Sequence, residues 1–194
     1  MTSTRWGSSD LEVLPDDGKR YEIVDGELYV SKQPHWYHQL VCTRLTSLLD
    51  SYSKATRLGF ANQAPGVILA DDDDVAPDVI WISNTRLQTA LGRDGKLHAA
   101  PELVIEVLSP GTANERRDRE AKLKLYSRRG VSEYWIVDWV SKHILVYQRE
   151  DAQLRLARTL YEVDILSSDL LPGFSAPVTD LFVGIPAEID PTST

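Results

Sequence analysis

Four stretches of this sequence carry charged side chains that could act together on a phosphodiester bond. Asp78 follows Ala76-Pro77, and Glu106 lies within the apolar run Leu103–Leu108. Lys122 lies in the basic segment Arg116–Arg129, and Glu22 follows Tyr21 near the start. Charged side chains are almost never fully buried unless they are paired or bind a metal. Two strand carboxylates followed by a helical lysine therefore suggest a divalent-metal phosphodiesterase site.

Glu106 is the most informative of these residues, because its neighbours predict a strand that is covered on both faces. Side chains alternate along a strand, so Glu106 shares a face with Val104 and Leu108. An unpaired carboxylate there would cost several kcal/mol or take up a proton. Its partner is therefore either a metal ion or the side chain of an arginine or lysine in a buried ion pair.

Asp78 opens the next apolar strand, Val79–Ile82, directly after a proline. Taken alone, it could be a turn-capping aspartate. Beside Glu106 it acquires a second interpretation, since Mg²⁺ prefers one or two carboxylates together with water and phosphate oxygens. We therefore expect Asp78 and Glu106 to bind Mg²⁺, with Mn²⁺ as a substitute.

Lys122 is the better placed of two lysines on the predicted helix. Its neighbours three and four residues later are Leu125 and Tyr126, so its stem should face the sheet while its ammonium reaches a polar site. There it would stabilise charge that develops on a phosphate. The alternative is a simple helical ion pair with Asp118, four residues earlier.

Three further residues have two interpretations each. Glu22, on the first predicted strand, is either an additional site carboxylate or a surface glutamate. His38 shares a helix face with Val41 and Leu45, so it either lines the site or forms a backbone hydrogen bond in the core. Cys42 is the only cysteine, which excludes an internal disulfide, and we expect a buried structural thiol.

The composition is that of a globular protein with a single core. The chain has 194 residues, of which 42% are apolar and 26% charged, values typical of a globular domain. We expect an irregular segment at 1–14, one domain at 15–183 and a frayed tail at 184–194. No secretory signal and no apolar run of the roughly 18 residues needed for a membrane span is found, so a cytoplasmic location is expected.

The net charge of −8 argues mildly against tight, sequence-independent binding of nucleic acid. Asp71–Asp74 supplies four of the negative charges, and we expect this run to form a solvated loop. The segment Arg116–Arg129 is locally basic, and Arg116, Arg117 and Arg119 are candidate phosphate contacts. A solvated helix face is the alternative for these arginines.

The predicted elements alternate between strands and helices. The pattern indicates a hairpin over 21–31 turning at Asp25-Gly26, a helix after Pro34, and strands within 60–69, 79–82 and 103–108. A helix over Asn114–Arg129, ended by Gly130, and strands over 133–140 and 143–149 follow. This order favours an α/β fold in which helices pack on a central sheet.

The ordered set of these motifs resembles the Uma2 family, a bacterial group assigned to the PD-(D/E)XK, or restriction endonuclease-like, nucleases. The resemblance covers about residues 15 to 150. It is carried by the segments 21–28, 76–79, 101–110, 122–126 and 130–138, together with His38.

This resemblance implies a restriction endonuclease-like core, in which a central mixed β-sheet is flanked by helices. It also implies that Asp78 and Glu106 are the metal ligands and that Lys122 is the site lysine. The common superfamily pattern has a lysine two residues after the acid, where this chain has Leu108. A lysine moved to the following helix fits the helix-phase argument for Lys122.

The leading hypothesis is a metal-dependent endonuclease that hydrolyses DNA, with Asp78, Glu106, Lys122 and Glu22 in the catalytic site. One alternative is a non-catalytic module that keeps the fold and binds nucleic acid or protein. Another is a buried ion-pair network of Glu106, Lys122 and Asp78 with a structural role. Oligomeric state stays open, although cleavage of both DNA strands favours a two-fold symmetric homodimer.

Overall fold

A mixed six-stranded sheet forms the centre of the protein, for which a computed structural model describes residues 5–109 and 116–187. Its strand order is β10-β9-β8-β7-β6-β3. Only β7 and β8 run parallel, and the other neighbours are antiparallel. The strands are β3 (Gly59–Gln63), β6 (Val79–Ser83), β7 (Leu103–Val107), β8 (Glu133–Asp138), β9 (His143–Glu150) and β10 (Gln153–Tyr161).

A smaller antiparallel sheet packs above it, with strand order β2-β1-β5-β4. Its strands are β1 (Arg20–Val24), β2 (Glu27–Ser31), β4 (Val67–Ala70) and β5 (Asp73–Val75). The predicted hairpin is confirmed: Asp25 and Gly26, between β1 and β2, have φ values of 54° and 77°. Positive φ at both turn residues suits the twist of a two-residue hairpin.

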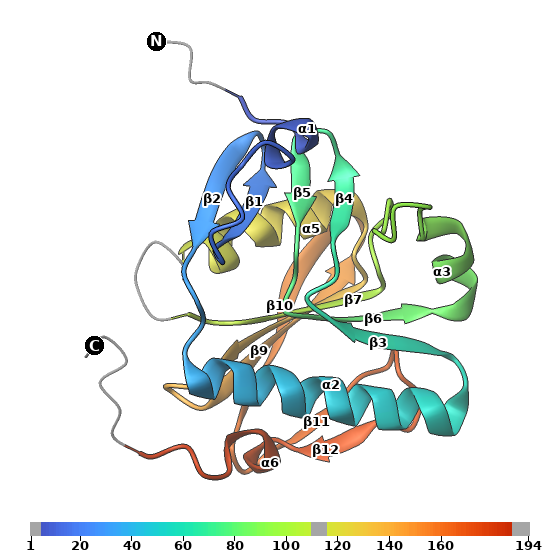
Figure 1. Cartoon of the computed structure of the whole chain (residues 1–194). Coiled ribbons are helices and arrows are strands. Elements are labelled where there is room, and N and C mark those ends of the chain that lie inside the picture. The colour runs from blue at the N-terminus through green and yellow to red at the C-terminus, as the bar shows by residue number, and fades with distance from the viewer. Residues whose placement is uncertain (1–4, 110–115, 188–194) are drawn as a thin grey trace.

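Helices cover both faces of the large sheet (Figure 1). The long helix α2 (Trp36–Thr56) lies on one face. On the other face, a π-helical turn η1 (Arg117–Lys122) continues into α5 (Leu123–Arg129), which lies beside the small sheet. The remaining elements are α1 (Ser8–Leu11), α3 (Asn84–Ala90), β11 (Ile165–Ser167), β12 (Ser175–Pro177) and α6 (Thr179–Phe182).

The apolar core is divided by the large sheet into two layers. On β7, Leu103, Ile105 and Val107 pack with α2, whereas Val104 packs with α5 and the small sheet. The alternation predicted for this strand is therefore confirmed, and Glu106 belongs to the layer of α5. A carboxylate in that position faces the helix that carries Lys122. The predicted α/β fold, with a central mixed sheet flanked by helices, is confirmed.

The aspartate run differs from its prediction as a solvated loop. Asp73 and Asp74 belong to β5 and are buried. Asp73 accepts hydrogen bonds from Arg128 and Arg129, and Asp74 lies 3.4 Å from the ammonium of Lys96. These basic partners lie far along the chain, so the local sequence did not reveal them.

The segment boundaries also differ in detail. Residues 8–11, expected to be irregular, form α1, and Ser8 donates a backbone hydrogen bond to Asp71. Ile185, expected in a frayed tail, is buried in the core. The predicted helix start at Asn114 lies outside the described residues, as do 1–4 and 188–194. Gly130 adopts the predicted left-handed conformation at the end of α5.

A membrane-spanning helix requires about 18 or more consecutive apolar residues. Within residues 5–109 and 116–187, no helix is both long and apolar enough to cross a membrane.

Candidate functional site

Strand pairing brings Asp78 next to Glu106. Val79 on β6 pairs with Ile105 on the antiparallel strand β7, so continuing this register by one residue places Asp78 opposite Glu106. The backbone N–H of Val107 donates a 2.9 Å hydrogen bond to Oδ2 of Asp78. Both side chains are buried, at 5% and 1% exposure. The two predicted metal ligands therefore lie together beneath the surface.

Lys122 completes this arrangement from the helix. It is the last residue of η1 and is fully buried. Its Nζ lies 2.9 Å from Oε1 of Glu106 and 2.9 Å from Oε1 of Glu22. The predicted sheet-facing orientation is thus correct, and one ammonium links a glutamate of the large sheet to one of the small sheet. The simple pair with Asp118 is a longer contact of 3.9 Å.

Asp78 has three hydrogen-bonding partners that keep it ionised. Besides the Val107 N–H, Nη1 of Arg20 lies 3.0 Å from Oδ1 and Nε2 of His38 lies 3.2 Å from Oδ2. Burial alone would raise the pKa of Asp78, but the hydrogen bond and charge of His38 and the charge of Arg20 outweigh it. The pKa of Asp78 is therefore held below its ordinary value.

Glu106 is in the opposite electrostatic situation. Oε1 accepts hydrogen bonds from Lys122 Nζ and from the hydroxyl of Tyr126, each at 2.9 Å. Burial nevertheless raises the pKa of Glu106 to about 8, and the negative charges of Asp78, Asp118 and Glu22 add to this effect against the opposing charge of Lys122. A proton therefore occupies this carboxyl at neutral pH when nothing else compensates its charge.

Glu22 carries an unsatisfied oxygen into the site. Oε1 accepts from the backbone N–H of Ala76 at 2.9 Å in addition to Lys122. Oε2 is buried and has no hydrogen-bond partner in the described part of the chain; Nη1 of Arg117 lies 3.7 Å away. Burial raises the pKa of Glu22, but the charges of Lys122 and Arg117 outweigh burial, so the pKa lies below its ordinary value. A buried oxygen without a donor is a position where a cation would be accommodated.

The charges around Lys122 do not balance. Glu22, Asp78 and Glu106 are joined by a fourth buried carboxylate, Asp118, which lies 2.9 Å from the guanidinium of Arg117. Against these four carboxylates stand three cations among the described residues, namely Lys122, Arg117 and Arg20. His38, beside Asp78, adds a fourth positive charge when it is protonated. With every carboxylate ionised and His38 neutral, the cluster has one excess negative charge, which either a proton or a bound cation can compensate.

A basic pocket of about 190 Å³ gives access to the Asp78 side of this cluster. Asp78 and His38 lie in its wall, together with Lys19, Arg20 and Lys32. A pocket with several cations around a carboxylate suits an anionic ligand that approaches a metal site.

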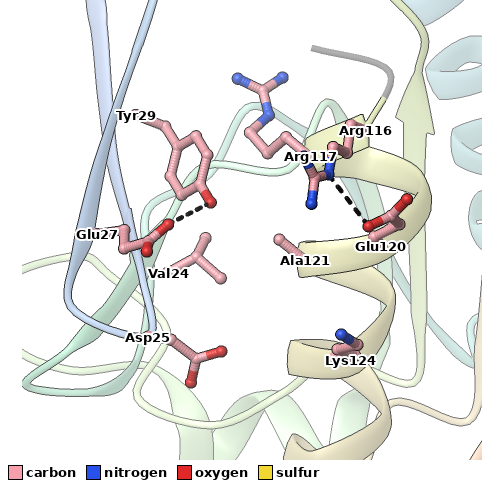
Figure 2. A pocket seen from close by; sticks show the side chains of 9 residues that line it. All are labelled: Val24, Asp25, Glu27, Tyr29, Arg116, Arg117, Glu120, Ala121 and Lys124. Atoms are coloured by element: carbon pink, nitrogen blue, oxygen red, sulfur yellow. Dashed lines mark hydrogen bonds and ion pairs between the residues drawn. The ribbon is translucent and has the colours of Figure 1, made fainter. Parts of the chain in front are cut away.

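A larger groove of about 480 Å³ lies between the β1–β2 hairpin and the helix η1–α5 (Figure 2). Its walls carry acidic and basic side chains in equal number, and Arg116 turns back onto Glu120. Asp78, Glu106 and Lys122 do not line this groove. Of these three residues, Asp78 alone lines the smaller pocket, which is therefore the opening to the Asp78 side of the cluster.

The three arginines predicted to contact nucleic acid have different environments. Arg117 is buried and donates to Asp118 and to the hydroxyl of Ser31. Arg119 lies 3.6 Å from Asp138, and the mostly exposed Arg116 pairs with Glu120. Their role as phosphate contacts stays a prediction, and the position of Arg117 makes it part of the site interior.

Sequence reasoning missed several residues of this cluster. Helical spacing placed Asp118 and Tyr126 beside Lys122, but neither was assigned to the carboxylate cluster itself. Arg20 shares a strand face with Glu22 through the two-residue period. Its partnership with Asp78, 58 residues away, had no local signal.

The carboxylate set fits a hard divalent cation such as Mg²⁺. Asp78 and Glu106 offer oxygen donors from adjacent strands, Glu22 has a free buried oxygen, and the cluster has an excess negative charge. These are the donors that Mg²⁺ prefers. The ion pair of the structural alternative is also present, since Lys122 contacts Glu106 directly. Both interpretations are therefore open to experiment.

Comparison with known proteins identifies the family to which the chain belongs. The sequence pattern of Uma2, described as "Putative restriction endonuclease", matches residues 8–179. The chain belongs to the Uma2 family. No curated protein matches the sequence.

Among solved structures, this Uma2 chain is similar to "a putative nuclease belonging to DUF820" from Anabaena variabilis ATCC 29413. The two are 17% identical, with a TM-score of 0.71, and the match covers 91% of this chain and 97% of the other. At this identity the likeness establishes a shared fold.

The pKa of Glu106 leads to a prediction for the metal-free protein. Between pH about 4.5 and 8 the folded chain holds a proton that the unfolded chain has lost, so the free energy of unfolding should fall as pH rises. The slope should approach about 1.4 kcal/mol per pH unit. The Glu106→Gln variant cannot ionise at this position. It should therefore show a flatter dependence of the free energy of unfolding on pH, and a higher free energy of unfolding at pH 8 than the unsubstituted protein.

Urea unfolding at pH 5 to 8 with a chelator would measure this slope. Glu120→Gln is the control, because Glu120 is largely exposed, and it should keep the slope of the unsubstituted protein. An unchanged slope in Glu106→Gln would show that Glu106 is ionised throughout and paired with Lys122 in a structural role.

Proposed function

We propose that this Uma2 protein is a metal-dependent endonuclease that hydrolyses phosphodiester bonds in DNA. The observation that supports it most is the pairing of Asp78 and Glu106 across adjacent strands, with Lys122 bridging Glu106 to Glu22 in a cluster that has more carboxylates than cations. Membership in a family described as "Putative restriction endonuclease" points to the same reaction class.

Asp78 and Glu106 would hold the metal, and Glu22 would assist through its free oxygen. A bound divalent cation would supply Lewis-acid stabilisation of phosphate charge and lower the pKa of a coordinated water. The remaining contributions come from the chain itself. Asp78 is already ionised at neutral pH, so it needs no proton loss to serve as a ligand.

Lys122 would stabilise negative charge in the reaction. Burial lowers its pKa, but Glu106 and Glu22 outweigh this and keep the pKa above its ordinary value, so the ammonium stays charged. Once the charge of Glu106 is compensated by a metal, the hydrogen-bonding capacity of Lys122 can be directed at a phosphate oxygen. Tyr126 and the π-helical turn hold the surrounding groups in place.

The basic pocket would position the substrate. Lys19, Arg20 and Lys32 line it beside Asp78, so a phosphodiester in the pocket would meet cations on its way to the metal ligands. This local charge offsets the net charge of −8 of the whole chain. The acidic residues Asp73 and Asp74 are internally paired, which reduces the repulsion they would exert on DNA.

Cleavage of supercoiled plasmid tests the proposal directly. The unsubstituted protein should nick or linearise DNA with Mg²⁺ or Mn²⁺ and not with a chelator, and Glu106→Gln should lower the rate at least about a hundredfold. Glu133→Gln is a matched control, since Glu133 is a buried glutamate on the neighbouring strand β8 that bonds to Trp135 and Ser168. Its rate should match that of the unsubstituted protein.

Two outcomes of this assay would contradict the proposal. Folded protein that cuts no DNA substrate, single-stranded or double-stranded, would favour a non-catalytic module with the same fold. Metal-dependent cleavage that survives in Glu106→Gln would show that the metal ligands lie elsewhere.

The pocket gives a separate prediction for binding. Lys32→Ala should weaken DNA binding and reduce the slope of log affinity against log salt by about 0.9, the value expected for one lost phosphate contact. Lys54→Ala should change neither, because Lys54 lies in the last turn of α2 and pairs with Asp50. Fluorescence anisotropy of a labelled DNA duplex, recorded in Ca²⁺ at several salt concentrations, measures both the affinity and its salt slope. Equal slopes for the two variants would exclude this pocket as the DNA entry.

A further inference from the structure

Three residues beside the carboxylate cluster form a second donor set of different chemistry. His38 and Cys42 lie one turn apart on α2, and Asp78 precedes β6. One donor atom from each residue lies within 4.8 Å of the donors of the other two. All three residues are buried, so their proximity is a property of the packed interior and not a chance meeting of mobile surface side chains.

The individual contacts have the spacing of zinc ligands. Zn–N and Zn–S bonds of about 2.0 and 2.3 Å in a tetrahedral site place nitrogen about 3.5 Å from sulfur and about 3.3 Å from oxygen. Sγ of Cys42 lies 3.6 Å from Nδ1 of His38, and Nε2 of His38 lies 3.2 Å from Oδ2 of Asp78. The two contacts use opposite ring nitrogens, so the imidazole must turn to present one nitrogen to a shared metal.

We propose that His38, Cys42 and Asp78 bind Zn²⁺ as a three-ligand site. Zn²⁺ would displace the thiol proton of Cys42, which leaves to solvent, and would replace the two hydrogen bonds of His38. Arg20 can keep its contact, because it binds Oδ1 of Asp78 whereas His38 binds Oδ2. The assignment of this zinc site does not depend on the proposed nuclease activity.

The donor types distinguish this site from the one for Mg²⁺. A thiolate and an imidazole select zinc and similar thiophilic metals, whereas Mg²⁺ requires oxygen ligands. His38 and Asp78 also line the basic pocket, which provides an entry route and room for a fourth ligand such as water. Three protein ligands with one open position is the arrangement of accessible zinc sites, while structural zinc sites are closed by four.

Asp78 is common to both donor sets, and this makes the two metals competitors. A zinc ion bound at Oδ2 of Asp78, the oxygen that contacts His38, would repel a second divalent cation at the same carboxylate. The competition rests on the proposed function, because it assumes that Asp78 and Glu106 hold the second metal. Zinc and cadmium should therefore displace Mn²⁺ from the protein, and this site would act as a metal-dependent inhibitory switch.

Cobalt substitution provides the decisive test, because a cobalt–thiolate bond gives an intense charge-transfer absorption in the near ultraviolet. The chain has a single cysteine, so such a band can come only from Cys42. Co²⁺ should produce the band at one equivalent per chain, and Zn²⁺ should abolish it. Cys42→Ser should show no band, and His38→Ala should lower Co²⁺ affinity at least about tenfold.

His98→Ala is the matched control, because His98 also contacts a carboxylate, that of Asp94, but has no thiol beside it. This variant should keep the full band. Absence of the band from folded, unsubstituted protein would overturn the zinc site, as would a band whose strength and affinity do not change in His38→Ala. Neither measurement involves nucleic acid, so failure of the zinc site and failure of the nuclease proposal can be told apart.

Discussion

The ammonium of Lys122 is shared by two buried glutamates, Glu22 and Glu106, each 2.9 Å from its Nζ. Removing the lysine from such a buried arrangement would leave uncompensated carboxylates and cost about 3–5 kcal/mol. One ammonium cannot neutralise two carboxylates, and Asp78 and Asp118 add further negative charge nearby. Even with Arg20 and Arg117 in the cluster, the four carboxylates outnumber the cations when His38 is neutral. The chain then holds a proton at Glu106 or binds a cation, and this requirement links its stability to its chemistry.

The same contacts connect the three layers of the fold. Glu22 belongs to the small sheet, Glu106 to the large sheet and Lys122 to the helix between them, so the charged cluster fixes how these elements dock. A second set of ion pairs, between Asp73 on β5 and Arg128 and Arg129 on α5, joins the small sheet to the same helix. Charge pairing thus accompanies apolar burial on this face, whereas α2 packs on the opposite face mainly through apolar side chains.

The sequence predicts this site well where the pattern is local. Strand alternation placed Glu106 on the same face as Val104 and Leu108, a face that packs against α5 in the structure. Helix phase oriented Lys122 toward the sheet, and both predictions depend on neighbours within four residues. Asp73 was misjudged because its run of aspartates is polar locally, while the arginines that neutralise it lie about 55 residues away. Arg20 was missed for the same reason, since its contact with Asp78 depends on how the two sheets dock.

Binding of Mn²⁺ to the isolated protein, followed by electron paramagnetic resonance, tests the central claim that the cluster has a place for one divalent cation. One Mn²⁺ should bind per chain, and binding should be lost in Glu106→Gln but kept in the control Glu133→Gln. Equal Mn²⁺ binding by Glu106→Gln and the unsubstituted protein, or no binding by folded protein, would contradict the claim. The cluster would then be an ion-pair network whose role is to hold the layers together.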